Sequence, residues 1–146
     1  MENEIEILLV EDNPDDLAMT LRALNKANLS NRIQVARDGV EALDFLFAEG
    51  AHAGRGLHHT PKVVLLDLKL PRVDGMEVLR RVKTDPRTKL IPVVVLTSSK
   101  EQKDVVDSYQ LGVNSYIVKP VNFERFATAV AELGMYWVLL NQPPHL

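Results

Sequence analysis

Two short, uninterrupted apolar runs constrain the fold of this chain more than any other feature. Residues 63–66 and 93–96 are rich in β-branched side chains and are too short to be buried helices. Strands that are apolar on both faces are typical of a parallel sheet that helices cover on both sides. Residues 5–10 have the same character, residues 32–36 alternate like an edge strand, and residues 115–118 form a fifth short apolar segment. The sequence therefore predicts five strands.

Helical segments with recognisable ends fill the intervals between these strands. Asn13 is a good N-cap before Pro14, so Asp15 and Asp16 are interpreted as acids that favour the start of a helix. Ser99 with Gln102 resembles a capping box for the fourth helix. Five strands that alternate with five helices predict an α/β fold, a doubly wound parallel sheet with helices on both faces. Right-handed crossovers favour the flavodoxin-like strand order 2-1-3-4-5.

The whole chain, residues 1–146, is expected to be a single domain. Residues 5–121 would form its α/β core, and residues 122–142 an extended C-terminal helix that Asn122 caps. Residues 49–60, which are rich in Gly and His, are interpreted as a surface loop.

Polar residues follow four of the five predicted strands directly. Glu11 and Asp12 follow the first strand, Asp67 the third and Lys119 the fifth, while Thr97 ends the fourth. Ligands of open parallel sheets bind beyond the carboxyl ends of the strands, so these side chains are expected at one rim.

Three carboxylates that lie close together repel one another unless they are protonated or bridged by a cation. An all-oxygen ligand set without cysteine favours Mg²⁺. A metal, a lysine and a hydroxyl are the groups that hold a transferring phosphoryl group, and an aspartate can be the nucleophile that accepts it. Asp67 is the predicted nucleophile because it ends the central strand.

Composition excludes several other classes of protein. The formal net charge is −3 and no basic tract occurs, so a nucleic-acid partner is not expected. No segment approaches the roughly 20 apolar residues of a membrane span, and no signal peptide is recognisable, so the expected location is cytoplasmic. The chain has no cysteine, which excludes disulfides and thiolate metal sites.

Together, the motifs around these residues resemble the motif set of response-regulator receiver domains. Each motif is weak alone, but they occur in the family's order over nearly the whole chain. The motifs are Leu9-Val10-Glu11-Asp12, Leu66-Asp67-Leu68-Lys69-Leu70-Pro71 with Asp74-Gly75, Leu96-Thr97-Ser98, and Tyr116-Ile117-Val118-Lys119-Pro120. One departure is that many members have two Asp residues where this chain has Glu11-Asp12.

The resemblance implies a function in two-component phosphorelay signalling. Asp67 would accept a phosphoryl group from a sensor histidine kinase, with Mg²⁺ held by Glu11, Asp12, Asp67 and the main-chain carbonyl of Lys69. The domain would catalyse only its own phosphorylation and slow dephosphorylation, so it is not expected to be an enzyme with a diffusible substrate. Its output would be a change in protein–protein contacts.

The resemblance also implies the residues that respond to phosphorylation. Thr97 would donate its hydroxyl to the phosphoryl group, Lys119 would pair with the phosphate, and Tyr116 matches the family's aromatic switch position. The Lys119–Pro120 peptide bond is usually cis in this family.

A finer similarity is to the small receivers that partner bacteriophytochrome-type histidine kinases. It depends on Tyr109, residues 114–116 and the Tyr136-Trp137 pair. Residues 135–140 are apolar almost all the way round a helix, and an exposed apolar patch usually marks an interface. The sequence therefore predicts a homodimer through the fifth helix, with Tyr136 and Trp137 in the contact. The alternative is that this last turn folds over the domain's own edge.

Three other functions fit parts of the sequence. A phosphatase of the haloacid dehalogenase type needs a second Asp two residues after the nucleophile, where this chain has Lys69. A flavodoxin-like FMN carrier is disfavoured because the carboxylates of residues 11–16 would repel the FMN phosphate. A degenerate receiver that only binds partners is disfavoured by the complete set of site residues.

Overall fold

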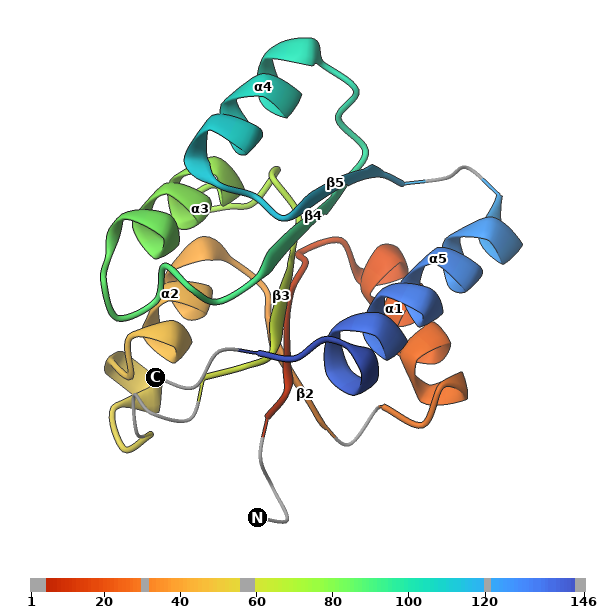
Figure 1. Ribbon diagram of the computed structural model, residues 1–146, viewed down its shortest axis with the longest axis horizontal. Coiled ribbons are helices and arrows are strands. Elements are labelled where there is room, and N and C mark those ends of the chain that lie inside the picture. The colour runs from red at the N-terminus through yellow and green to blue at the C-terminus, as the bar shows by residue number, and fades with distance from the viewer. Residues whose placement is uncertain (1–4, 30–31, 56–59, 120–121, 144–146) are drawn as a thin grey trace.

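Five parallel strands form one sheet in a computed structural model that describes residues 5–29, 32–55, 60–119 and 122–143 (Figure 1). The strand order is β2-β1-β3-β4-β5, which confirms the predicted fold class and order. The strands are β1 (Ile7–Val10), β2 (Ile33–Ala36), β3 (Val63–Leu66), β4 (Val93–Thr97) and β5 (Ser115–Val118).

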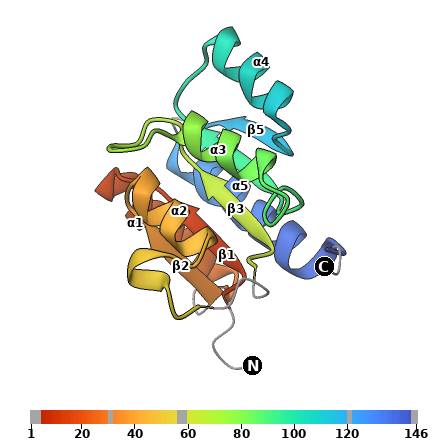
Figure 2. The same ribbon diagram turned by 90° about the vertical axis from the view of Figure 1, so that its left-hand side faces the viewer.

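Helices cover both faces of this sheet, as Figures 1 and 2 show. Helices α1 and α5 pack against each other on one face, and α2, α3 and α4 lie on the other. Their bounds are α1 (Pro14–Lys26), α2 (Gly39–Leu46), α3 (Gly75–Thr84), α4 (Gln102–Leu111) and α5 (Phe123–Met135). None of the helices in the described ranges combines the length and apolar character that a bilayer span requires.

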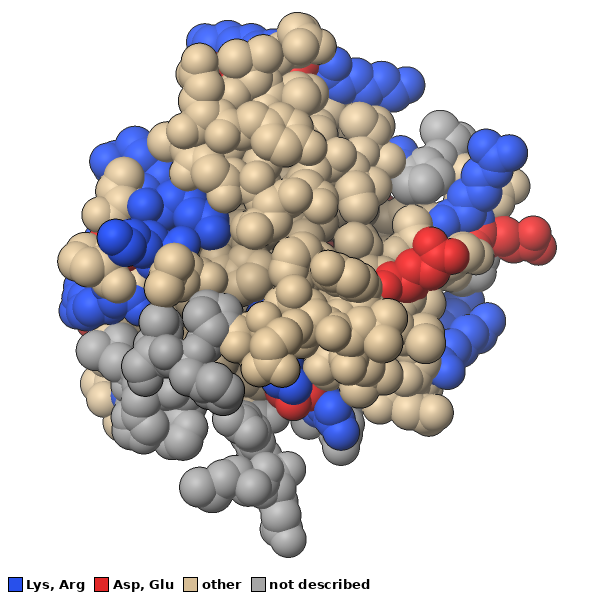
Figure 3. Space-filling model, viewed as in Figure 1, with Lys and Arg blue, Asp and Glu red and all other residues tan. Residues whose placement is uncertain are grey.

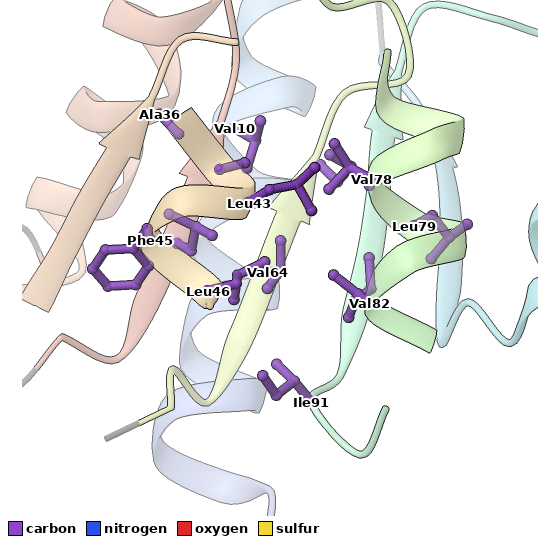
Figure 4. Packing of buried hydrophobic residues seen from close by; sticks show 14 of the residues in the cluster. Val10, Ala36, Leu43, Phe45, Leu46, Val64, Val78, Leu79, Val82 and Ile91 are labelled. Carbon is purple, nitrogen blue, oxygen red and sulfur yellow. The ribbon is translucent and has the colours of Figure 1, made fainter. Parts of the chain in front are cut away.

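The side chains of the central strands enter two apolar clusters, one on each face of the sheet. They are called the α2–α3 cluster and the α1–α5 cluster after the helices that cover them. Val64 and Leu66 of β3 face α2 and α3, where they pack with Val78 and Val82 (Figure 4), whereas Val63 and Leu65 face α1 and α5. All four residues of β3 are buried, as its uninterrupted apolar run predicts. Burial of each such side chain contributes about 1.5–3 kcal/mol to folding, so the sheet forms a rigid support for the residues that follow its strands.

Side-chain caps fix the positions of the helix starts. The Asn13 side chain accepts hydrogen bonds from the amides of Asp15 and Asp16, at 2.9 and 3.0 Å, which confirms the predicted cap of α1. Asn122 likewise accepts a hydrogen bond from the Arg125 amide. The prediction for α4 was wrong, because its N-cap residue is Glu101 and Ser99 lies two residues earlier. The Ser99 hydroxyl donates to the carboxylate of Asp104 in the first turn of α4.

The C-terminal segment departs from one regular helix. Helix α5 ends at Met135, and a π-helical turn, η3 (Tyr136–Leu140), follows it directly. Val138 of this turn is buried, and its carbonyl accepts a hydrogen bond from Lys62. Trp137 packs partly buried against the α1–α5 cluster. This turn therefore covers the domain's own edge with one side and leaves the other side exposed.

The described part of the predicted loop at residues 49–60 is attached to the end of α2. A short 3-10 turn, η2 (Gly50–His52), begins it. The Arg55 guanidinium donates to the carbonyls of Phe45 and Leu46 and lies 4.3 Å from the Phe45 ring centroid. These contacts supply donors to carbonyls at the end of the helix, although the Phe45 carbonyl also accepts a hydrogen bond from the Ala48 amide.

Candidate functional site

The carboxyl ends of four strands bring the predicted site residues together. Because Val10 pairs with Leu66 in the parallel ladder, the residues that follow them, Glu11 and Asp67, lie side by side. Thr97 ends β4, and Lys119 follows β5 directly. Glu11, Asp67 and Thr97 are buried, although two of them carry charge and the third is polar.

The Asp67 carboxylate is held from both sides. One oxygen, Oδ1, accepts hydrogen bonds from the Thr97 hydroxyl at 2.8 Å and from the Lys69 amide at 3.2 Å. The other, Oδ2, lies 3.0 Å from the Lys119 ammonium. Burial by itself would raise the pKa of Asp67, but the charge of Lys119 and the hydrogen bonds from Thr97 and Lys119 keep that pKa below its usual value. Asp67 is therefore an ionised carboxylate with a fixed orientation.

The Lys119 ammonium contacts three carboxylates. Its Nζ atom lies 2.6 Å from Glu11, 2.7 Å from Asp16 and 3.0 Å from Asp67, and its side chain is only 8% exposed. Burial by itself would lower the pKa of Lys119, but the hydrogen bonds to Asp16 and Glu11 and the charge of Asp67 raise it above its usual value. Lys119 therefore stays cationic in this buried position.

Asp16 is a site residue that the sequence interpretation missed. Asp15 and Asp16 were both expected to act only as helix-start acids, but the structure places Asp16 against Lys119. No local sequence signal could have found this contact, because Asp16 and Lys119 are 103 positions apart in the chain.

Three carboxylates form a cluster with the geometry of a metal site. Glu11, Asp12 and Asp67 each offer an oxygen, and these oxygens lie within 4.8 Å of one another. Burial raises the pKa of Glu11 to about 7; the hydrogen bond from Lys119 opposes this shift and the charge of Asp67 adds to it. Hard oxygen ligands with this surplus of negative charge fit a divalent cation such as Mg²⁺.

Tyr116 lies beside this site on β5. Its ring packs against the α2–α3 cluster, and its hydroxyl donates to the main-chain carbonyl of Ser99 at 3.0 Å. The predicted switch residue therefore contacts the loop that connects Thr97 to α4. Pro120, and with it the Lys119–Pro120 peptide bond, lies outside the described residues.

Capping and close packing explain why Asp74 and Gly75 stand at the start of α3. Asp74 caps α3 by accepting a hydrogen bond from the Glu77 amide. A Cβ atom at Gly75 would lie 2.1 Å from the Asp67 carbonyl oxygen, so only glycine lets α3 begin this close to the end of β3. The start of α3 thus fixes the main chain that carries Asp67.

Known proteins are similar to this chain over nearly its whole length. The family model of the response regulator receiver domain matches residues 7–131. Response regulator Rcp1 of Synechocystis sp. is 38% identical over 132 residues, which are 90% of this chain and 88% of Rcp1. A solved structure of Mn(2+)-bound Rcp1 has a TM-score of 0.87 with 36% identity and covers 96% of this chain and 99% of that chain.

Two further solved structures are phytochrome response regulators. The phosphorylated cyanobacterial protein RcpA has a TM-score of 0.88 and 38% identity, covering 97% of this chain and 99% of its own. The bacteriophytochrome response regulator AtBRR is 56% identical, with a TM-score of 0.74 and coverage of 94% and 98%. These similarities confirm the predicted family and its two-component signalling function. The chain belongs to the response regulator receiver domain family.

Proposed function

We propose that Asp67 accepts a phosphoryl group from a sensor histidine kinase and that this event switches the conformation of the domain. The observation that carries the proposal is the environment of the Asp67 carboxylate, which meets a hydroxyl, an ammonium and two further acidic residues at the end of the central strand. Each of these groups has a defined task in phosphoryl transfer.

In the transfer step, an Asp67 oxygen forms a bond to phosphorus while the phosphorus–nitrogen bond of the kinase's phosphohistidine breaks. The imidazole nitrogen keeps the bonding electron pair, so the phosphoryl group ends as an aspartyl phosphate. The Thr97 hydroxyl and the Lys119 ammonium, which already contact Asp67, then bind phosphoryl oxygens. Mg²⁺ would be held by Glu11, Asp12, Asp67 and the Lys69 carbonyl, and when bound it neutralises charge on the phosphoryl oxygens.

Labelling with acetyl phosphate tests this assignment. In the presence of Mg²⁺, intact-mass measurement should show one added phosphoryl group, and Asp67→Asn should remove nearly all of it. Asp74→Asn is a matched control, because it removes a nearby carboxylate while asparagine still caps α3. Labelling of Asp67→Asn at the wild-type rate, or labelling that a chelator leaves unchanged, would contradict the proposal.

The switch would act through the residues that contact Asp67. A phosphoryl group that draws Thr97 and Lys119 inward would move the start of the β4–α4 loop, which Tyr116 also contacts. The surface built by α4, β5 and α5 would then change its partners. We propose that the chain works in this way as a single cytoplasmic domain, residues 1–146, with signalling rather than substrate turnover as its activity.

The proposed kinase partner is of the bacteriophytochrome type. This choice rests on the high similarity to AtBRR, which is a bacteriophytochrome response regulator, and to the phytochrome response regulator RcpA. Phosphoryl transfer from purified bacteriophytochrome kinases, compared with unrelated histidine kinases, tests it. Faster transfer from an unrelated kinase would count against this choice.

A homodimer through α5 and η3 remains part of the proposal. Large apolar side chains are exposed here, including Tyr136 at 49% and Leu140 at 74%, while Trp137 is partly exposed beside them. The side of the molecule in Figure 3, which carries α4, β5 and α5, is uncharged through its centre. Large apolar side chains that are exposed together on one segment usually mark a protein contact.

Sedimentation at micromolar concentration tests the dimer. Leu140→Glu should shift the wild-type dimer toward monomer without preventing phosphorylation. Leu90→Glu is the control, because Leu90 is also exposed, at 49%, but precedes β4 at the other end of that strand from Thr97. A wild-type protein that stays monomeric with and without phosphorylation would contradict the dimer.

A further inference from the structure

Asp16 is the Lys119 partner that the metal cluster does not include. Of the three carboxylates that contact the ammonium, Glu11 and Asp67 also belong to the cluster of possible metal ligands, and Asp16 does not. The three N–H groups of an ammonium are matched by three acceptors. A metal and Lys119 therefore compete for Glu11 and Asp67, but not for Asp16.

The position of Asp16 is fixed by helix α1 and not by the metal cluster. Its amide donates to the Asn13 side chain, and its carbonyl accepts a hydrogen bond from the Thr20 hydroxyl at 2.8 Å. Its carboxylate is partly exposed, at 25% of the side-chain surface, yet lies 2.7 Å from the lysine. None of the groups that hold Asp16 in place belongs to the cluster of possible metal ligands.

We propose that Asp16 is a positioning residue that holds Lys119 when a divalent cation takes over Glu11 and Asp67. Without this carboxylate, the full attraction of Lys119 would fall on the two metal ligands, and the cation would have to displace it without compensation. With it, the lysine keeps a charged partner and remains beside Asp67, where the phosphoryl group arrives. The inference rests on the proposed metal site and adds to it a residue that sets the cation affinity.

Asp15 provides a matched control within the same helical turn. It is exposed and precedes Asp16 directly, and both amides bond to Asn13. Asp15→Asn and Asp16→Asn therefore remove the same charge from adjacent positions in the first turn of α1. A general loss of negative potential affects both variants, whereas loss of the Lys119 contact affects only Asp16→Asn.

Binding of Mn²⁺ alone, measured from the electron paramagnetic resonance signal of the free ion, tests the inference without phosphorylation. Asp16→Asn should weaken Mn²⁺ binding by about threefold to tenfold, the size expected for loss of a partly buried ion pair, and Asp15→Asn by less than about twofold. Asp16→Glu, which restores the carboxylate, should recover part of the affinity. Acetyl phosphate labelling of Asp16→Asn should need more Mg²⁺ than wild type to reach half of its own maximal rate.

A second pair of variants tests whether the effect passes through Lys119. In a Lys119→Met background, which keeps the volume and removes the charge, Asp16→Asn and Asp15→Asn should have equal effects on Mn²⁺ binding. A selective effect of Asp16→Asn that persists in this background would instead make Asp16 a direct metal ligand and overturn the positioning role.

The remaining outcomes separate this inference from the proposed function. Wild-type protein that binds no Mn²⁺ would overturn the metal site and this inference with it. Wild-type binding with equal affinities for Asp15→Asn and Asp16→Asn, or tighter binding by Asp16→Asn, would overturn the positioning role alone.

Discussion

The Tyr116 hydroxyl lies 3.0 Å from the main-chain carbonyl oxygen of Ser99, so strand β5 is bonded to the loop between β4 and α4. The Ser99 hydroxyl continues this contact to Asp104 in the first turn of α4. The same loop begins at Thr97, whose hydroxyl bonds to Asp67. One short loop therefore contacts the acceptor, the aromatic side chain of β5 and the start of α4.

Removal of the Tyr116 hydroxyl should loosen this loop without affecting the acceptor. Tyr116→Phe keeps the ring in the α2–α3 cluster, so the expected loss in the free energy of unfolding is about 0.5–1.5 kcal/mol, the net value of one hydrogen bond. Urea unfolding measures it, and acetyl phosphate labelling should be unchanged. Tyr109→Phe is the control, because Tyr109 is 54% exposed. Equal stability of the two variants would show that the hydrogen bond contributes nothing.

Substitutions of Thr97 should separate its hydroxyl from its packing. Thr97 is fully buried and its hydroxyl is the donor to Asp67 Oδ1. Thr97→Val keeps the shape and removes the donor, so labelling by acetyl phosphate should slow on the order of a hundredfold, as for other single donors in a transfer site. Thr97→Ser keeps the donor and should stay close to the wild-type rate. A slow Thr97→Ser with a fast Thr97→Val would show that packing, not the hydroxyl, matters.

Alanine at Gly75 should damage both stability and labelling. The added methyl group would meet the carbonyl oxygen of Asp67 at 2.1 Å, so α3 or the end of β3 must move. Overpacking of this kind costs about 1–3 kcal/mol, and the displaced main chain carries the acceptor. Gly54→Ala is the control, since nothing lies within 4 Å of its Cβ position. Thermal unfolding and intact mass measure the two effects; a Gly75→Ala variant that matches Gly54→Ala in both would refute the steric argument.

Lys83 should make stability depend on pH. Its ammonium donates to the Ile91 and Lys89 carbonyls, and burial lowers its pKa from the usual 10.5 to about 8. Because the folded-state pKa is the lower one, the unfolded chain binds the proton more tightly. The free energy of unfolding should therefore rise as the pH increases from about 8 to about 10.5.

The comparison with Lys83→Met isolates this contribution, because methionine has no titrating group. The difference in the free energy of unfolding between wild type and variant, measured by urea unfolding at several pH values, should grow in favour of the wild type over that range. A difference that stays constant with pH would show that Lys83 titrates equally in the folded and unfolded chains.

Local sequence patterns were sufficient for the strands and for most helix starts. The runs at β3 and β4 are apolar at consecutive positions because both faces of the sheet are covered, and burial on both faces requires that pattern. Asn13 and Asn122 cap their helices as predicted, because a cap depends only on residues two or three positions away. The prediction at Ser99 was wrong because α4 begins two residues later than the capping pattern indicated, with Glu101 as its N-cap, and the Ser99 hydroxyl donates to Asp104.

The sequence by itself determined which residues reach the rim of the sheet, since Glu11, Asp67, Thr97 and Lys119 stand where strands end and parallel strands end at one edge. Only the tertiary structure decided which of these residues touch. Asp16 and Lys119 are 103 positions apart, and their contact depends on how α1 packs beside the end of β5. The exposed and covered sides of η3 were decided in the same way, because an all-apolar turn carries no periodic pattern to orient it. The spacing of apolar residues shows which side of one helix or strand is buried. Which side chains of different elements contact each other depends on how those elements pack in the folded domain.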